Sequence, residues 1–186
     1  MRVPAALLVL LALPAAAQDD WRADRGPSWG VRADLDGDGA PESYLLEDNG
    51  KGSVDLWVEA GGTQVGFREV AWLGAAAGQE PWLEVTEAGS LRIVSLNEGI
   101  GRYRWELVLT VAHREGAPRV AGFTYTWRDT LDLDAFGVCD VNLLTGEGTL
   151  ETAKGVVAVR APFPAPPLAD WREADTDRLL APCGLP

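Results

Sequence analysis

The chain has little of the chemistry on which many enzymes depend. It contains one histidine, His113, and two cysteines, which do not stand in a CxxC redox spacing. No Ser-His-Asp set is apparent, no zinc signature is present, and no phosphate-binding glycine loop follows a predicted strand. His113 stands at the end of an apolar strand face, beside a charged turn, so we expect it at the rim of the core. The sequence therefore favours a protein without evident catalysis.

Positive charge is also scarce. The chain has 16 Lys and Arg against 28 Asp and Glu, which gives a formal net charge of −12. An acidic surface repels phosphate groups, so nucleic acid and anionic membranes are not expected partners. The composition, with 47% apolar and 24% charged residues, is otherwise typical of a globular protein and argues against disorder.

The one long apolar run lies at the amino terminus. Arg2 precedes an apolar stretch over residues 5–13, and three alanines at 15–17 come just before a polar segment. This order predicts a cleavable signal peptide over residues 1–17, because a membrane span needs about 20 apolar residues. We expect a periplasmic or secreted protein with no membrane span, whose mature part, residues 18–186, forms a single β-rich domain.

Cys139 and Cys183 are expected to form a disulfide, because an exported chain meets oxidising conditions. The chain-entropy relation assigns a loop of this length about 4 kcal/mol of stabilisation as an upper value. A catalytic thiol is the alternative. The bridge would fasten the carboxyl-terminal tail to the body of the protein.

The fold is predicted to be mainly β, an antiparallel meander that forms a sandwich or a curled sheet. Short β-branched and aromatic runs alternate with glycine-containing turns that are too short for parallel crossovers. The predicted strands cover residues 44–47, 54–59, 65–72, 82–86, 91–96, 103–113, 120–127, 137–142, 148–152 and 156–160.

Two of these strands are predicted to form a hairpin through a turn at residues 114–118. Alternation places one set of side chains on an apolar face, and we expect its aromatic members to be core. In the first strand this set is Trp105, Leu107, Leu109, Val111 and His113, and in the second it is Ala121, Phe123, Tyr125 and Trp127.

The carboxyl-terminal region, residues 161–186, reads as a proline-rich strap followed by a short helix. Prolines disfavour helix interiors and central strands, so the strap should run over the body of the protein. The helix is expected from Asp170 to Leu180, with Asp170 as its cap and Glu173 at the third helical position.

The stretch DLDGDGAPE, residues 34–42, is a candidate calcium loop. Calcium takes six to eight oxygen ligands, and alternating acids around a glycine turn can wrap the ion. We expect side-chain ligands from Asp34, Asp36, Asp38 and Glu42, and a backbone carbonyl from Ala40. An EF-hand is excluded, because Leu45 stands where its bidentate glutamate belongs. The alternative is an acidic turn that binds no metal.

Residues 29–48, WGVRADLDGDGAPESYLLED, resemble the calcium loop of FG-GAP or VCBS-type repeats, which occur in β-propellers and in secreted bacterial proteins. The resemblance implies a loop between two strands with a structural calcium ion. Glu42 stands where that family has a final aspartate. The chain carries one copy, whereas a propeller typically needs four or more blades. We therefore expect the ion site of these repeats in this chain, but not their propeller fold. The middle of the chain, residues 89–148, resembles small exported proteins of Gram-negative bacteria.

Three functions are therefore considered. The leading hypothesis is a calcium-stabilised binding or structural module with an envelope protein or a glycan as partner. The second is a carboxylate hydrolase acting on glycans, since acid pairs alone can cleave glycosidic bonds; its candidate acids are Glu98, Asp129, Asp132 and Asp134. The third is an extracytoplasmic inhibitor or immunity protein, with the loop at residues 97–102 as its contact.

Overall fold

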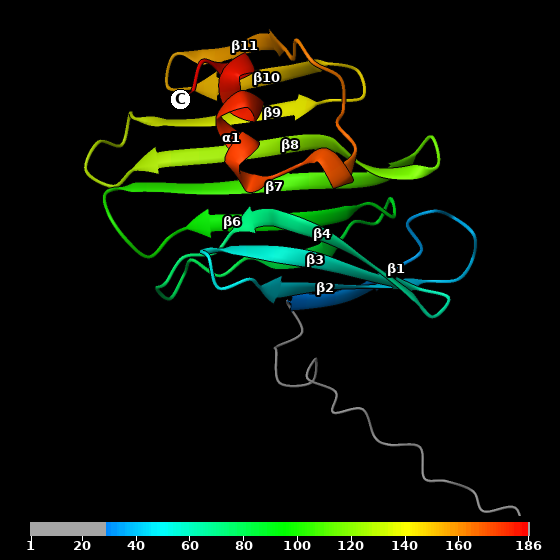
Figure 1. Cartoon of the computed structure of the whole chain (residues 1–186). Coiled ribbons are helices and arrows are strands. Elements are labelled where there is room, and N and C mark those ends of the chain that lie inside the picture. Colours follow the sequence, from blue (N-terminus) through cyan, green and yellow to red (C-terminus); the bar gives the residue numbers. More distant parts are fainter. Residues whose placement is uncertain (1–28, 186) are drawn as a thin grey trace, which may run out of the picture.

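The computed structural model describes residues 29–185. The predicted signal peptide, residues 1–17, lies outside these residues. Two antiparallel sheets pack face to face, and the carboxyl-terminal segment lies beside the smaller sheet on the same face of the larger one (Figure 1). The predicted fold class is therefore confirmed. No helix in residues 29–185 combines the length and the apolar character that a bilayer span requires.

The smaller sheet has four strands in the order β1-β2-β3-β4. These are β1 (Gly30–Ala33), β2 (Glu42–Asp48), β3 (Ser53–Ala60) and β4 (Thr63–Trp72). Strands β2 to β4 fall on predicted runs, whereas β1 was not among those runs and was implied only by the resemblance to the calcium-loop repeats. β1 pairs with β2 in antiparallel register, with Ala33 opposite Glu42, and these two residues frame the acidic loop.

The larger sheet has seven strands in the order β11-β10-β9-β8-β7-β6-β5. They are β5 (Trp82–Val85), β6 (Leu91–Asn97), β7 (Tyr103–Arg114), β8 (Ala117–Asp129), β9 (Phe136–Asn142), β10 (Glu147–Thr152) and β11 (Gly155–Arg160). Within this sheet, strands that are consecutive in sequence pair with one another, which confirms the predicted meander.

The hairpin of β7 and β8 is the long central element of this sheet. Arg114 pairs with Ala117, so the turn itself is Glu115-Gly116, with positive φ angles of 54° and 79° at the two positions. Two positive φ values are the mark of the type I′ turn, whose twist matches the strands that it joins.

The apolar face of this hairpin packs inward as predicted for its aliphatic residues and Phe123. The core cluster contains Leu107, Leu109, Val111 and Phe123, and Trp105 and Tyr125 pack against it half-buried. Trp127 was expected in the core but is only half-buried and lies outside the cluster. Val120 takes the place of Ala121 in the cluster, although Ala121 is itself buried. The register of β7 and β8 shifts between Thr110 and Val111, because β8 carries one extra residue there. Such a bulge reverses which side chains face the core.

A second bulge distorts β4 opposite Asp55. The Asp55 carboxylate is 3% exposed and accepts hydrogen bonds from the Glu69 amide at 2.8 Å, the Arg68 guanidinium at 2.6 Å and the Asn49 amide at 3.3 Å. Burial alone would raise the pKa of Asp55, but these hydrogen bonds outweigh it and hold the pKa below its ordinary value. Asp55 therefore fastens the bulge to β3.

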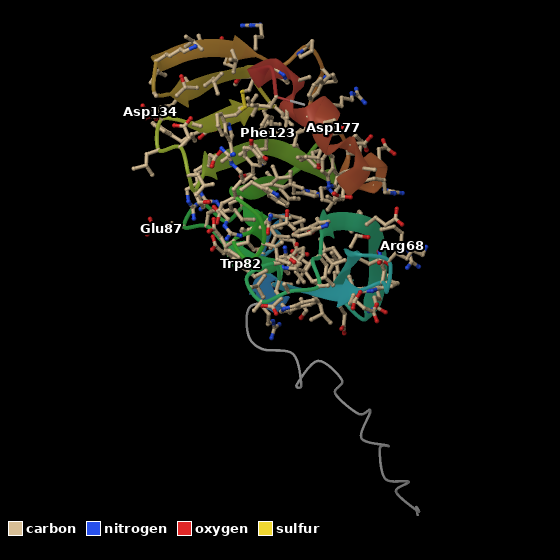
Figure 2. The ribbon with its side chains drawn as sticks, turned by 90° about the vertical axis from the view of Figure 1, so that its left-hand side faces the viewer. Arg68, Trp82, Glu87, Phe123, Asp134 and Asp177 are labelled. Atoms are coloured by element: carbon tan, nitrogen blue, oxygen red, sulfur yellow. A yellow bond between two sulfur atoms is a disulfide. The ribbon has the colours of Figure 1, made fainter. Side chains whose placement is uncertain are left out.

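The core lies between the two sheets and continues under the carboxyl-terminal segment. It contains residues of both sheets together with Leu168, Trp171, Leu179 and Leu180, and Phe123 of β8, labelled in Figure 2, is one of its fully buried members. The Trp171 indole donates a hydrogen bond of 2.8 Å to the carbonyl of Val70 in β4. Because both groups are buried, this bond ties the strap to the smaller sheet.

The predicted strap is present, but the helix begins later than predicted. Short 3₁₀ turns, η2 (Leu168–Asp170), η3 (Glu173–Asp175) and η4 (Ala181–Cys183), flank one α-helix, α1 (Thr176–Leu180). Asp170 ends η2 and caps no helix, and Glu173 is the first residue of η3. The reason is Trp171, whose extended backbone and buried indole separate the two helical turns.

The predicted disulfide is formed. Cys139 of β9 and Cys183 of η4 are joined with their Cα atoms 6.1 Å apart, within the usual range for such bridges. Both side chains are buried, so the bridge holds the end of the chain against the larger sheet.

Candidate metal centre

The acidic loop, residues 34–41, connects β1 to β2 and is shaped by its own carboxylates. Asp34 accepts hydrogen bonds from the amides of Gly37 at 2.8 Å and Gly39 at 2.9 Å. Both glycines have positive φ, 79° and 89°, a conformation that other residues rarely adopt. The chain therefore curls around Asp34 and returns its later acids to the same place.

The remaining loop acids make similar local bonds. Asp36 accepts a hydrogen bond from the Asp38 amide at 3.1 Å, and Asp38 accepts one from the Ala40 amide at 2.7 Å. Each bond uses one carboxylate oxygen and leaves the other available. These turns pre-organise the loop, since the backbone amides fix where each carboxylate points.

Glu42 differs from the three aspartates because it is buried, with 6% of its surface exposed. One oxygen, Oε2, accepts hydrogen bonds from the Leu35 amide at 2.9 Å and from the Tyr44 hydroxyl at 2.7 Å. Burial raises the pKa of Tyr44, and the hydrogen bond to Glu42 and the charges of Glu42, Asp36 and Asp34 raise it further. The Tyr44 hydroxyl therefore stays protonated and continues to donate to Glu42. Sequence reasoning did not identify Tyr44.

These four side chains form one group. Asp34, Asp36, Asp38 and Glu42 each place a carboxylate oxygen within 4.8 Å of the others. None of the four forms an ion pair with another residue in the described part of the chain. Four negative charges at this spacing repel one another, and an oxygen-only set of donors suits a hard cation such as Ca²⁺. Ala40 as a carbonyl ligand remains a prediction.

The acids considered for glycan hydrolysis are held by other partners. Glu98 forms a two-pronged ion pair with Arg128. Asp129 accepts a bond of 2.8 Å from Arg102 and another from the Leu131 amide. The hydrogen bond from Arg102 lowers the pKa of Asp129, so this carboxyl is a poor proton donor.

The other two acids of that set lie in the loop between β8 and β9. Asp132 accepts a hydrogen bond from the Asp134 amide at 3.1 Å, and both residues are exposed. Their role is that of turn residues.

The loop considered for an inhibitor, residues 97–102, is a tight turn built on Asn97, which exchanges hydrogen bonds with the backbone of Ile100. Ile100 itself is 58% exposed. The loop is joined to the β8–β9 loop, where the Thr130 amide donates to the Arg102 carbonyl at 2.9 Å.

Comparison with protein-family models, with curated proteins and with solved structures finds no match to this chain, so the acidic loop is interpreted on its geometry alone.

Proposed function

We propose that this chain is an extracytoplasmic binding module stabilised by calcium, with no catalysis of its own. The ion would be held by the carboxylates of Asp34, Asp36, Asp38 and Glu42, with the Ala40 carbonyl completing the loop. The supporting observation is the convergence of four carboxylate oxygens within 4.8 Å in a loop that its own amides shape. The compartment is supported by the buried disulfide and by the predicted signal peptide.

Calcium is favoured over other metals by the chemistry of the donors. The loop offers oxygen ligands and no histidine or cysteine, which argues against zinc and copper. Magnesium demands near-ideal octahedral geometry, whereas calcium accepts a larger and less regular ligand shell. Extracellular calcium modules have dissociation constants of about 10⁻⁴ to 10⁻³ M, and we expect a value in this range or somewhat lower.

The bound ion would act on the edge of the smaller sheet. β1 has four residues and is the edge strand of the smaller sheet, beside β2. An ion held by the loop and by Glu42, the first residue of β2, would fix the connection between the two strands. We therefore propose a structural ion that keeps β1 in place.

The test is thermal unfolding of the mature chain in EDTA, in Ca²⁺ and in Mg²⁺ at matched ionic strength. We expect Ca²⁺ to raise the melting temperature clearly and Mg²⁺ to raise it much less, because an ion that binds only the folded state stabilises it by mass action. Identical curves in EDTA and in Ca²⁺ would contradict the proposal.

A second candidate function, an inhibitor or other partner-binding protein, is favoured by the two joined loops at one end of the larger sheet. Together with the first residue of β7, they expose four large apolar side chains, Ile100, Tyr103, Leu131 and Leu133, the last at 85%. Exposed apolar groups of this kind are common at protein contacts.

Replacing Leu131 and Leu133 with serine should abolish capture of a partner from periplasmic extract. The control is Val65→Ser, which changes an exposed position on β4. Equal capture by both variants would refute this function.

A further inference from the structure

A cavity of about 340 Å³ lies between the smaller sheet and the carboxyl-terminal helices. Its floor is the inner face of the larger sheet, and its two sides are β4 and the η3–α1 segment. Figure 1 shows β4 and α1 on the same side of the larger sheet. The volume is within the range of small-molecule sites, about 300 to 1,000 Å³.

The cavity has aromatic walls. Trp72 comes from β4, Trp105 from β7 and Tyr125 from β8, and all three are only partly buried. The rings follow one another, with centroids 5.2 Å apart for Trp72 and Trp105 and 6.3 Å apart for Trp105 and Tyr125. Ring faces of this kind bind apolar groups and attract cations.

The charge in the cavity is negative. Glu173 and Asp177 line it, and no Lys, Arg or His of the described chain is among its lining residues. Burial raises the pKa of Glu173, and the charges of Asp177 and Glu69 raise it further, so negative groups are crowded here. Figure 2 shows where Asp177 lies on the carboxyl-terminal helix.

The arginines nearest in sequence are occupied elsewhere. Arg172 donates to the carbonyls of Ala169 and Trp171, and Arg178 lies over the Phe163 ring at 5.1 Å. Neither therefore neutralises the carboxylates of Glu173 and Asp177.

Two hydroxyl groups on the cavity floor also have no partner. Ser95 of β6 is 3% exposed, and its hydroxyl makes no hydrogen bond within residues 29–185. The Tyr125 hydroxyl has no partner there either, and burial raises its pKa. Neither oxygen is among the fully buried unpaired atoms of the described residues, so both keep access to solvent. The Ser95 hydroxyl, on a side chain that lines the cavity, is therefore open to a hydrogen bond from a ligand or a solvent molecule.

We infer that this cavity binds a small organic cation that carries N–H donors, such as an alkylguanidinium or an alkylammonium group. The cation would lie against the aromatic row and donate to Glu173, Asp177 and the Ser95 hydroxyl. A neutral sugar would leave the repulsion between the two carboxylates in place. Glycoside cleavage is also disfavoured, because Glu173 and Asp177 lie on one short helical segment and cannot flank a bond from two sides. This site is separate from the acidic loop.

The test compares two probes of the same shape, butylguanidinium and neutral butylurea, by following the indole N–H signals of Trp72 and Trp105 in ¹H–¹⁵N NMR. We expect butylguanidinium to bind about tenfold more tightly than butylurea, because only the cation gains charge-assisted hydrogen bonds and cation–π contact. Equal affinity, no shift with either probe, or shifts with methyl β-glucoside alone would each overturn the inference.

Variants locate the site. Glu173→Gln keeps the shape of the side chain and should weaken butylguanidinium about tenfold, and Ser95→Ala should weaken it by a smaller factor. The matched control is Glu87→Gln, which makes the same change in an exposed turn far from Asp177 (Figure 2) and should leave the affinity unchanged. If Glu173→Gln does not fold, the affinities of butylguanidinium and butylurea for the unmodified chain still test the inference. The titration is repeated in EDTA, so that failure of the calcium proposal is distinguished from failure of this one.

Discussion

Asp36→Asn provides a sharp test of the acidic loop, because its expected effect changes sign with calcium. The Asp36 carboxylate is exposed and accepts one hydrogen bond, from the Asp38 amide. Asparagine keeps an oxygen for this bond and removes one negative charge. The variant therefore separates the role of the charge from that of the turn.

Without calcium, the substitution should stabilise the protein. One oxygen of Asp36 lies within 4.8 Å of an oxygen of each of the three other carboxylates. At this spacing each like-charge pair costs about 1 kcal/mol in a water-like dielectric, before salt screening reduces it. We expect the free energy of unfolding in EDTA to rise by about 1 kcal/mol or slightly less.

With calcium, the order should reverse. At a calcium concentration 10 to 100 times the dissociation constant, the ion adds about 1.4 to 2.7 kcal/mol to the stability of the unmodified chain. For a domain of this size, that corresponds to an increase of about 3 to 10 °C in melting temperature. Loss of one charged ligand should remove most of this gain, so the variant melts below the unmodified chain in calcium and at or above it in EDTA.

The assay is differential scanning calorimetry or fluorescence-detected melting in both conditions. Asp48→Asn is the matched control, because Asp48 is exposed, accepts the same kind of turn bond from the Gly50 amide at 2.7 Å, and lies outside the acidic group. Its effect should not depend on calcium. If Asp36→Asn shifts the melting temperature equally in both conditions, the loop is an acidic turn and the calcium site is refuted.

Two further predictions concern what holds the fold together. Cys139→Ser with Cys183→Ser should lower the free energy of unfolding by up to about 4 kcal/mol, measured in guanidinium chloride; a midpoint unaffected by the loss of the bridge would contradict its stabilising role. Asp55→Asn should cost about 2 kcal/mol at neutral pH, because it removes a charged acceptor from a buried set of donors. Since the pKa of Asp55 is lowered on folding, its contribution is fully present above the unfolded value near 3.8 and is lost as the pH falls through the folded value. The difference between the two proteins should therefore shrink in acid, and a difference that stays constant below pH 3.8 would exclude this linkage.

The strands could be predicted because their signals are local. Alternation along β7 and β8 identifies the face that packs inward, and positive-φ residues such as Gly116 mark the ends of the hairpin. The alternation pattern did not identify β1, because four residues, one of them glycine, carry too little alternation; only the resemblance implied a strand there. Its pairing with β2 becomes evident only when the acidic loop closes.

Other features depend on partners that lie far away in the sequence. The bulge near Ala121 arises in the pairing of β8 with β7, and a single strand gives no sign of it. The helix boundary was wrong because Asp170 has the composition of a cap, whereas the bond from Trp171 to the Val70 carbonyl sets the backbone there.

The two candidate sites also differ in whether their residues are local in the sequence. The acids of the acidic loop and Glu42 lie within nine consecutive residues, so the sequence alone indicates that they can converge. The cavity gathers Trp72, Ser95, Trp105 and Glu173 from four separate elements. Sequence reasoning treated Glu173 as a capping residue, because nothing local relates it to the sheet beneath it.

The acidic loop and the cavity share one property: their acids form no ion pair with the arginines of the described chain. Several acids of the chain are bound by its arginines: Asp55 by Arg68, Asp129 by Arg102, Glu98 by Arg128 and Glu147 by Arg160. The loop carboxylates and the pair Glu173 and Asp177 are bound by none within residues 29–185. Solvation is sufficient for scattered exposed acids, but Glu173 is half-buried and Glu42 is buried, each beside other acids. The Leu35 amide and the Tyr44 hydroxyl stabilise one oxygen of Glu42, but they add no positive charge to the group. In both places, we propose that a cation supplied from outside the chain offsets the surrounding negative charge.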